Sequence, residues 1–282
     1  MFGKKKDLKI LAEKSEIFGT IPEEQLSAEK IDEIKQIPLV AVGDIRNPNH
    51  VLSALKVLST KRVDAFLPVL SYAGIEYGDW PAFGKYLKQV KTVMEKKLKI
   101  YVLDPVLVGA PSFFRALNTS HAAEIKKRFG FYNPCLGCRI YSLAIRVPLC
   151  KKINAKIMIS GEIIFNNNEV DAFKVHQNLN SCSLLMKGFG IDLWDGTLTG
   201  DEADLVLRNL NIKNLLDDEF NFSCVMNKCC LSDTTSIGKS KLARKYYEDF
   251  AIPAAAKILS RVFSGSDVDY EREVSETLIS KV

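Results

Sequence analysis

A buried strand is predicted by the stretch Pro38-Leu39-Val40-Ala41-Val42, which is apolar and ends at Gly43-Asp44. Elements of alternating type follow it: a helix, a strand, a helix and a strand are expected over 50–59, 63–70, 80–98 and 100–103. This order predicts a parallel sheet whose strands are joined by right-handed helical crossovers. The fold class is therefore expected to be α/β, with helices flanking a parallel sheet.

The pattern continues beyond residue 103. Residues 155–159 predict a fourth strand, which is closed by Ser160-Gly161-Glu162. Further helices are expected over 120–129, 140–153, 201–209, 239–263 (with a break before Pro253) and 267–280. Near the N-terminus, Thr20 is expected to cap a helix that runs on to Ile34. We therefore divide the chain into a helical N-terminal extension, an α/β domain and C-terminal helices, at 1–36, 37–235 and 236–282.

Composition favours a cytoplasmic protein. The chain has 282 residues, of which 47% are hydrophobic and 26% charged, as expected for one sizeable domain with terminal additions. No apolar run reaches the roughly 20 residues of a membrane span, and Asp7 follows the N-terminal lysines where a signal would turn apolar. The net charge of +5 permits an anionic substrate such as a nucleotide or RNA without requiring one.

Five of the seven cysteines fall into two tight groups, the pair Cys135 and Cys138 and the trio Cys224, Cys229 and Cys230. A Cys-x-x-Cys pair brings two thiolates to one metal or to each other, and the odd total indicates a reducing compartment. With a cysteine of the second group, the pair could hold an iron–sulfur cluster or zinc. Alternatively, Cys224 and one member of the pair could form a redox and persulfide couple. Which of Cys229 and Cys230 contributes stays open.

The remaining two cysteines, Cys150 and Cys182, lie in periodic segments and are expected to be packing residues. The pair itself follows Asn133-Pro134, which we interpret as a turn, so Cys135 and Cys138 are expected in a loop that leads into a helix.

Ligands of an open α/β sheet bind beyond the carboxyl ends of its strands. Gly43, Asp44, Ser71 and Gly161 lie at such ends and are the candidate cofactor-binding residues. The loop 43–50 is the natural place for a phosphate, but it has a single glycine, and Asp44 would repel an anion. A nucleotide site and a plain strand-to-helix turn both remain open there, and we predict weak ATP binding or none.

One part of the sequence resembles a known family. The Asn133-Pro134-Cys135-Leu136-Gly137-Cys138 motif, a helix and the strand that ends at Gly161-Glu162 resemble the PP-loop ATP pyrophosphatases. These proteins have the adenine nucleotide α-hydrolase-like fold, a Rossmann-like (HUP-type) sheet, and the likeness is to their tRNA thiolation branch, the 2-thiouridylases. It covers roughly residues 37 to 235.

The resemblance implies adenylation of an oxygen by ATP with Mg²⁺, followed by sulfur transfer. The implied cofactor is an iron–sulfur cluster, of the 4Fe-4S type, ligated by Cys135, Cys138 and Cys224, with Cys229 or Cys230 as alternatives for the distal ligand. Cys224 and Glu162 are the implied catalytic residues. The implied partners are a nucleotide, a tRNA or a small thio or oxo substrate, and a sulfur donor protein.

The chain departs from the family at the first loop. The family signature SGGxDS is absent, since that position reads Gly43-Asp44-Ile45-Arg46-Asn47. A relative that kept the cysteine site and lost the pyrophosphatase would handle sulfur on the cluster alone, by transfer or by removal. The alternative hypothesis is a non-catalytic, degenerate nucleotide- or RNA-binding module whose cysteines hold a structural zinc.

Overall fold

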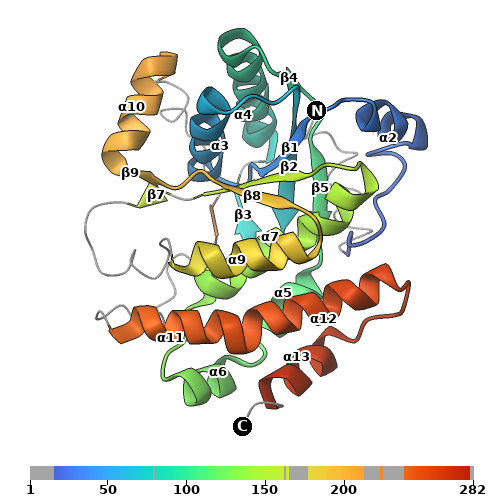
Figure 1. Cartoon of the computed structure of the whole chain (residues 1–282), viewed down its shortest axis with the longest axis vertical. Helices are drawn as coiled ribbons and strands as arrows, with labels where there is room; N and C mark the ends of the chain where they lie inside the picture. The colour runs from blue at the N-terminus through green and yellow to red at the C-terminus, as the bar shows by residue number, and fades with distance from the viewer. Residues whose placement is uncertain are drawn as a thin grey trace.

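The computed structural model describes residues 16–78, 80–161, 163–164, 177–212, 223–224 and 238–279. Within these residues, six strands form one parallel sheet in the order β4-β2-β1-β6-β8, with β5 also paired to β2 (Figure 1). The strands are β1 (Val40–Asp44), β2 (Ala65–Tyr72), β4 (Tyr101–Val102), β5 (Val106–Gly109), β6 (Ile157–Ser160) and β8 (Asp192–Asp195). The prediction of a Rossmann-like α/β fold is confirmed.

The central strand β1 explains how the sheet is built. All five of its residues are buried, as expected for a parallel strand that helices cover on both faces. It pairs with β2 on one side, where Asp44 lies opposite Val69, and with β6 on the other, where Gly43 lies opposite Ile159. The chain first builds the sheet outward through β2 and then returns past β1 to add β6. The direction of winding therefore reverses between β1 and β6, which is where such sheets bind ligands.

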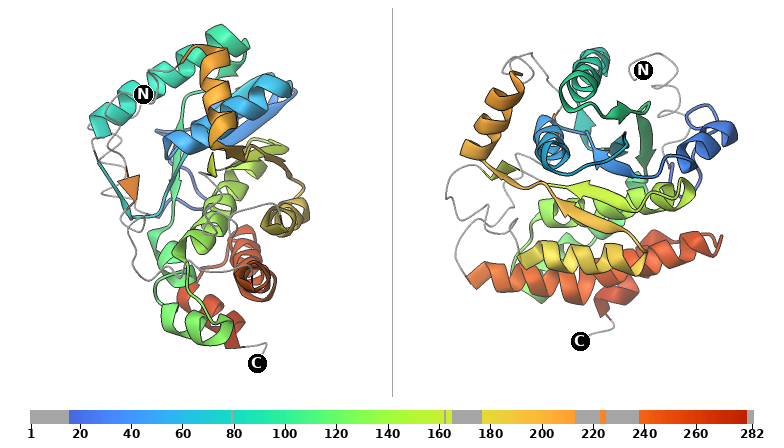
Figure 2. Two further views of the ribbon diagram at one scale, coloured as in Figure 1. Left: turned by 90° about the vertical axis from the view of Figure 1, so that its left-hand side faces the viewer. Right: turned by 45° about the horizontal axis from the view of Figure 1, so that its top comes forward.

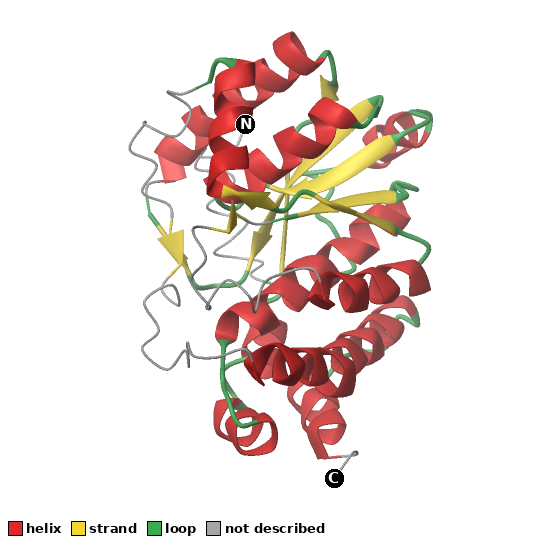
Figure 3. Cartoon of the chain, turned by 60° about the vertical axis from the view of Figure 1, so that its left-hand side comes forward, coloured by secondary structure: helices red, strands yellow, loops and turns green. Residues whose placement is uncertain are grey.

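Helices cover the two faces of the sheet in separate sets (Figures 2 and 3). One face carries α3 (Pro48–Thr60), α4 (Trp80–Val93) and the π-helical turn η1 (Met94–Leu98). The other carries α7 (Pro134–Lys152) and α9 (Gln177–Gly188). A third layer packs over α7 and α9 and consists of α11 (Gly238–Tyr246), η4 (Tyr247–Ala251) and α12 (Ile252–Phe263).

The remaining helices lie around this core, and they are α2 (Ala28–Lys35), α5 (Pro111–Leu117), α6 (Ala122–Phe129), α10 (Gly200–Leu210) and α13 (Tyr270–Ile279). The terminal helices join the same core, because Ile31 of α2 and Val274 of α13 are buried in one cluster with the sheet residues. No helix among the described residues is long and apolar enough to cross a membrane.

Three details of the predicted elements are wrong. The cysteine pair lies in a helix instead of a loop, because Asn133 caps α7 and Pro134 takes its first position, where a missing N–H costs nothing. The N-terminal helix is capped by Ser27 instead of Thr20. The helix expected to break before Pro253 continues through η4 into α12, where the proline stands in the first turn.

Candidate functional site

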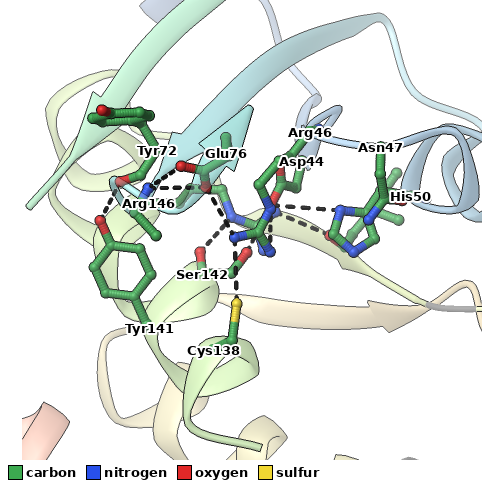
Figure 4. A network of polar contacts seen from close by, with 12 residues as sticks. Asp44, Arg46, Asn47, His50, Tyr72, Glu76, Cys138, Tyr141, Ser142 and Arg146 are labelled. Carbon is green, nitrogen blue, oxygen red and sulfur yellow. Dashed lines mark hydrogen bonds and ion pairs between the residues drawn. The ribbon is translucent and has the colours of Figure 1, made fainter. Parts of the chain in front are cut away.

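The candidate site lies at the carboxyl end of β1, where a buried carboxylate forms hydrogen bonds and ion pairs with several side chains (Figure 4). The Asp44 side chain is 5% exposed, and its Oδ2 accepts a hydrogen bond of 2.8 Å from Ser142 Oγ. Its Oδ1 accepts a hydrogen bond of 2.9 Å from the backbone N–H of Arg46. The carboxylate also lies 3.8 Å from the Arg46 guanidinium and 3.6 Å from His50 Nδ1. Asp44 therefore joins the β1–α3 loop to α7.

Arg46 connects two carboxylates to a cysteine. Its Nη1 lies 3.6 Å from Glu76 Oε1 and donates a hydrogen bond of 3.4 Å to Cys138 Sγ. Its Nη2 faces Asp44, and the side chain as a whole is 12% exposed. Burial works against the charged form, but the neighbouring sulfur and the two carboxylates outweigh it and raise the pKa of Arg46 well above its usual value. The guanidinium is a permanent cation of this site.

The Glu76 carboxylate is fixed by its own turn. It accepts hydrogen bonds of 3.0 and 3.1 Å from the backbone N–H of Ala73 and one of 3.1 Å from that of Ile75. Burial raises the pKa of Glu76, although Arg46 and these N–H groups pull it down. The carboxylate therefore holds Arg46 from the side opposite Asp44.

Charge balance explains how Asp44 stays ionised inside the protein. Burial by itself would raise the pKa of Asp44, but Arg46, His50 and Arg146 outweigh it and lower that pKa to about 2. Arg146 is 2% exposed, and its guanidinium donates to the carbonyls of Ser142 (2.8 Å) and Ile159 (3.2 Å). Burial lowers the pKa of Arg146, and Asp44 opposes that shift. Asp44 thus stabilises the charge of each arginine, and both arginines stabilise the Asp44 carboxylate.

The first turns of α7 supply the sulfur side of the site. Asn133 Oδ1 accepts a hydrogen bond of 2.9 Å from the backbone N–H of Cys135. The Cys135 side chain is exposed, whereas the Cys138 side chain is partly buried and contacts Arg46. Cys138 and Ser142 are four residues apart and so share one face of the helix. A guanidinium and a helix N-terminus both favour the thiolate form of a cysteine.

Gly137 lets this turn pack tightly. A Cβ at Gly137 would lie 2.0 Å from Asn118 Oδ1 and 2.9 Å from the hydroxyl of Tyr246. Only a residue without a side chain therefore allows α5 and α11 to approach the helix between the two cysteines.

One member of the distal cysteine group, Cys224, has its backbone near this site. The strand β10 (Ser223–Cys224) pairs antiparallel with β3 (Glu76–Tyr77), in a register that puts Cys224 opposite Glu76. Residues directly opposite in such a pair have Cα atoms about 5 Å apart. The backbone of Cys224 is thus beside the residue whose carboxylate contacts Arg46, and Arg46 contacts Cys138. The Cys224 side chain and the whole of Glu162, Cys229 and Cys230 lie outside the described residues.

The predicted cofactor-binding positions are packed closely. Gly43 lies against the Phe66 ring, and a Cβ at Gly161 would stand 2.5 Å from the carbonyl carbon of Gly196. Ser71 is fully buried, and its side-chain hydroxyl has no hydrogen-bond partner among the described residues. In the same part of the chain, no three His, Cys, Asp or Glu side chains are grouped as metal ligands. Cys150 and Cys182 are both fully buried, as packing residues should be.

Five members of the site were not predicted from the sequence, and they are Arg46, His50, Glu76, Ser142 and Arg146. Helical spacing could have indicated two of them if the helix had been predicted to begin at Pro134, because Ser142 and Arg146 follow Cys138 at intervals of four residues. Glu76 gave no such signal, since it reaches Arg46 only through the fold.

Comparison with known proteins finds one informative relative. No family model matches the chain. The uncharacterized protein MJ0009 of Methanocaldococcus jannaschii is 27% identical over 234 residues, covering 80% of this chain and 82% of that protein. The similarity therefore extends over most of both chains.

Proposed function

We propose that this protein is a sulfur-handling enzyme of the PP-loop-like class whose cysteines hold an iron–sulfur cluster. The observation that carries the proposal is the β3–β10 pairing, which brings Cys224 beside Glu76 and so to the contact between Arg46 and Cys138. This pairing supports the proposal because it brings the backbone of Cys224, about ninety residues beyond the cysteine pair in sequence, to the same edge of the sheet as Arg46.

The donor set fits such a cluster. Cys135 and Cys138 are three residues apart on the first turn of α7 and so lie on one side of the helix. A third thiolate, from Cys224 or from Cys229, would complete a three-cysteine site with one iron position left open. When bound, a cluster of this kind supplies an iron to which a substrate's sulfur can attach.

The residues of the chain have their own tasks in this proposal. The Arg46 guanidinium donates to Cys138 Sγ and would offset the negative charge that several thiolates bring together. Asp44 and Glu76 hold that guanidinium from two sides, and Ser142 fixes Asp44 to α7. Arg46 is therefore a positioning residue for the sulfur of Cys138, and Glu162 stays a candidate catalytic residue.

Metal and sulfide analysis tests the proposal. After anaerobic purification and reconstitution, the protein should contain iron and acid-labile sulfide and should be brown. Cys135→Ala, Cys138→Ala and Cys224→Ala should each lose both. Cys182→Ala is the matched control, because that thiol is fully buried on α9 and is not one of the proposed ligands, so this variant should keep the cluster.

Two outcomes would contradict the proposal. Stoichiometric zinc without sulfide would support a structural metal in its place. Retention of iron and sulfide in the Cys135→Ala and Cys138→Ala proteins would defeat the assignment of the ligands.

A further inference from the structure

We infer that this protein works without ATP and removes sulfur from thiocarbonyl compounds, releasing hydrosulfide. The inference rests on the proposed function and fixes the direction of its chemistry. It starts from the loop between β1 and α3, because a nucleotide phosphate in this kind of sheet sits on backbone N–H groups of that loop and on the N-terminus of the helix after it.

Several backbone donors of this loop form hydrogen bonds inside the protein. The N–H of Ile45 donates to the carbonyl of Val69 at 2.9 Å, and that of Arg46 donates to Asp44 Oδ1 at 2.9 Å. At the start of α3, the Asn47 side chain accepts a hydrogen bond of 2.9 Å from the backbone N–H of His50, and Pro48 has no N–H group. These internal bonds leave fewer backbone donors in this loop for a phosphate.

The charges of the loop also oppose a phosphate. The Asp44 carboxylate is ionised and stands at the start of the loop. Without its neighbouring cations, a like charge about 4 Å from a phosphate, at an effective dielectric constant near 20, would lower affinity on the order of 1000-fold. Arg46 would be the natural counter-cation, but it already contacts Asp44, Glu76 and Cys138.

The backbone after β6 and β8 is also tightly packed. Gly161 follows β6, and a Cβ there would lie 2.5 Å from the carbonyl carbon of Gly196 and 2.7 Å from Ser53 Cβ. At Gly196, a Cβ would lie 2.5 Å from the Ser53 carbonyl oxygen. The glycines at this edge serve the packing of α3 against the ends of β6 and β8.

The chemistry without ATP then has one favoured direction. Replacing a carbonyl oxygen by sulfur requires that oxygen to leave, and adenylation by ATP is what makes it a leaving group. Removing sulfur needs no such activation, because hydrosulfide leaves readily. The balanced reaction is R₂C=S + H₂O → R₂C=O + H₂S: the oxygen of water forms the new carbonyl bond, its two protons leave with the sulfur, and no oxidant or reductant takes part.

The test uses the full-length protein, anaerobically reconstituted, with 2-thiouracil and 4-thiouridine as probes. Loss of thiocarbonyl absorbance and release of hydrosulfide are measured with and without ATP and Mg²⁺, and ATP binding is measured by calorimetry. We expect equal amounts of hydrosulfide and oxo product without ATP, no change on adding ATP, and no turnover by Cys138→Ala. Lys91→Gln, which changes a surface lysine of α4, is the control and should act as the unaltered protein does.

The results separate this inference from the proposed function. A protein without iron and sulfide would overturn both. A cluster-loaded protein that turns over only with ATP, binds ATP at micromolar concentration, or releases no hydrosulfide from either probe would overturn the inference alone. Tight binding that Asp44→Ala abolishes would show that this carboxylate holds the magnesium of a nucleotide.

Discussion

Replacing Asp44 by asparagine tests whether the buried charge network is organised as described. The surrounding Arg46, His50 and Arg146 lower the pKa of Asp44 from 3.8 to about 2, against the effect of burial. At 1.36 kcal/mol per pKa unit, this shift corresponds to about 2 kcal/mol of stability at neutral pH. The side chain is 5% exposed, so solvent screens this term little.

The pH dependence has a definite sign. Because the folded-state pKa is depressed, the contribution of Asp44 is fully present above about pH 5 and is lost as the pH falls toward 2. About half of it should remain at pH 3. Asparagine carries no charge at any pH, so the difference in stability between the unaltered protein and Asp44→Asn should shrink by about 1 kcal/mol between pH 7 and pH 3.

Urea unfolding of both proteins at the two pH values measures this difference. At pH 7 we expect Asp44→Asn to lose about 2 to 4 kcal/mol, because Arg46 and Arg146 also lose a counter-charge. Asp32→Asn is the control, since that carboxylate is 72% exposed in a pair with Lys35 and should change stability by less than about 0.5 kcal/mol. A difference for Asp44→Asn that is the same at both pH values would refute the charge argument.

Three further substitutions, each tested by urea unfolding, probe the packing around the site and the ion pairs between Glu273 of α13 and Lys257 and Arg261 of α12. Gly137→Ala should cost about 1 to 3 kcal/mol because its Cβ would meet Asn118 Oδ1 at 2.0 Å, and a smaller cost in an Asn118→Ala background would verify that contact. Tyr141→Phe should cost about 1 to 3 kcal/mol, since it leaves the N–H of Ala110 and the carbonyl of Tyr72 without their shared hydroxyl; no loss would mean that another group replaces it. Glu273→Gln should cost about 1 to 3 kcal/mol at pH 7 and less below pH 4, because the hydrogen bond from Lys257 and the arginines Arg261 and Arg272 lower the pKa of that carboxyl; a pH-independent cost would contradict this.

The central strands could be predicted because their sequence is sufficient to define them. The residues of β1, β2 and β6 are mostly apolar runs that are buried on both faces. Such a run can be recognised from the local sequence, without knowing which distant strand pairs with it. The strand β5 was missed because Asp104-Pro105 suggested that the segment had ended, whereas the chain adds Val106–Gly109 beside β2. At the outer edge of the sheet, β8 is only partly buried, so its sequence lacks the apolar signal of a central strand.

The cysteine pair was predictable in kind but its local structure was not. The Asn-Pro dipeptide is typical of a turn, yet it also fits the cap and first position of a helix, and the two interpretations differ only in the conformation of the residues after the proline. Here Asn133 Oδ1 accepts from the N–H of Cys135, which decides for the helix. As a result Cys138 and Ser142 share a face and reach Arg46 and Asp44 together.

Asp44 shows why the charge of a loop residue cannot be interpreted from its neighbours in sequence alone. An aspartate after the first strand predicts repulsion of phosphate by Coulomb's law. That repulsion does not explain how the carboxylate stays ionised while buried. The explanation requires Arg146 and Ser142, which lie about a hundred residues further along the chain and approach Asp44 only when α7 packs against the sheet. With these partners, the charge of Asp44 is balanced by side chains of the protein and does not require a bound ion. Arg46, the cation of the β1–α3 loop, also donates a hydrogen bond to the sulfur of Cys138.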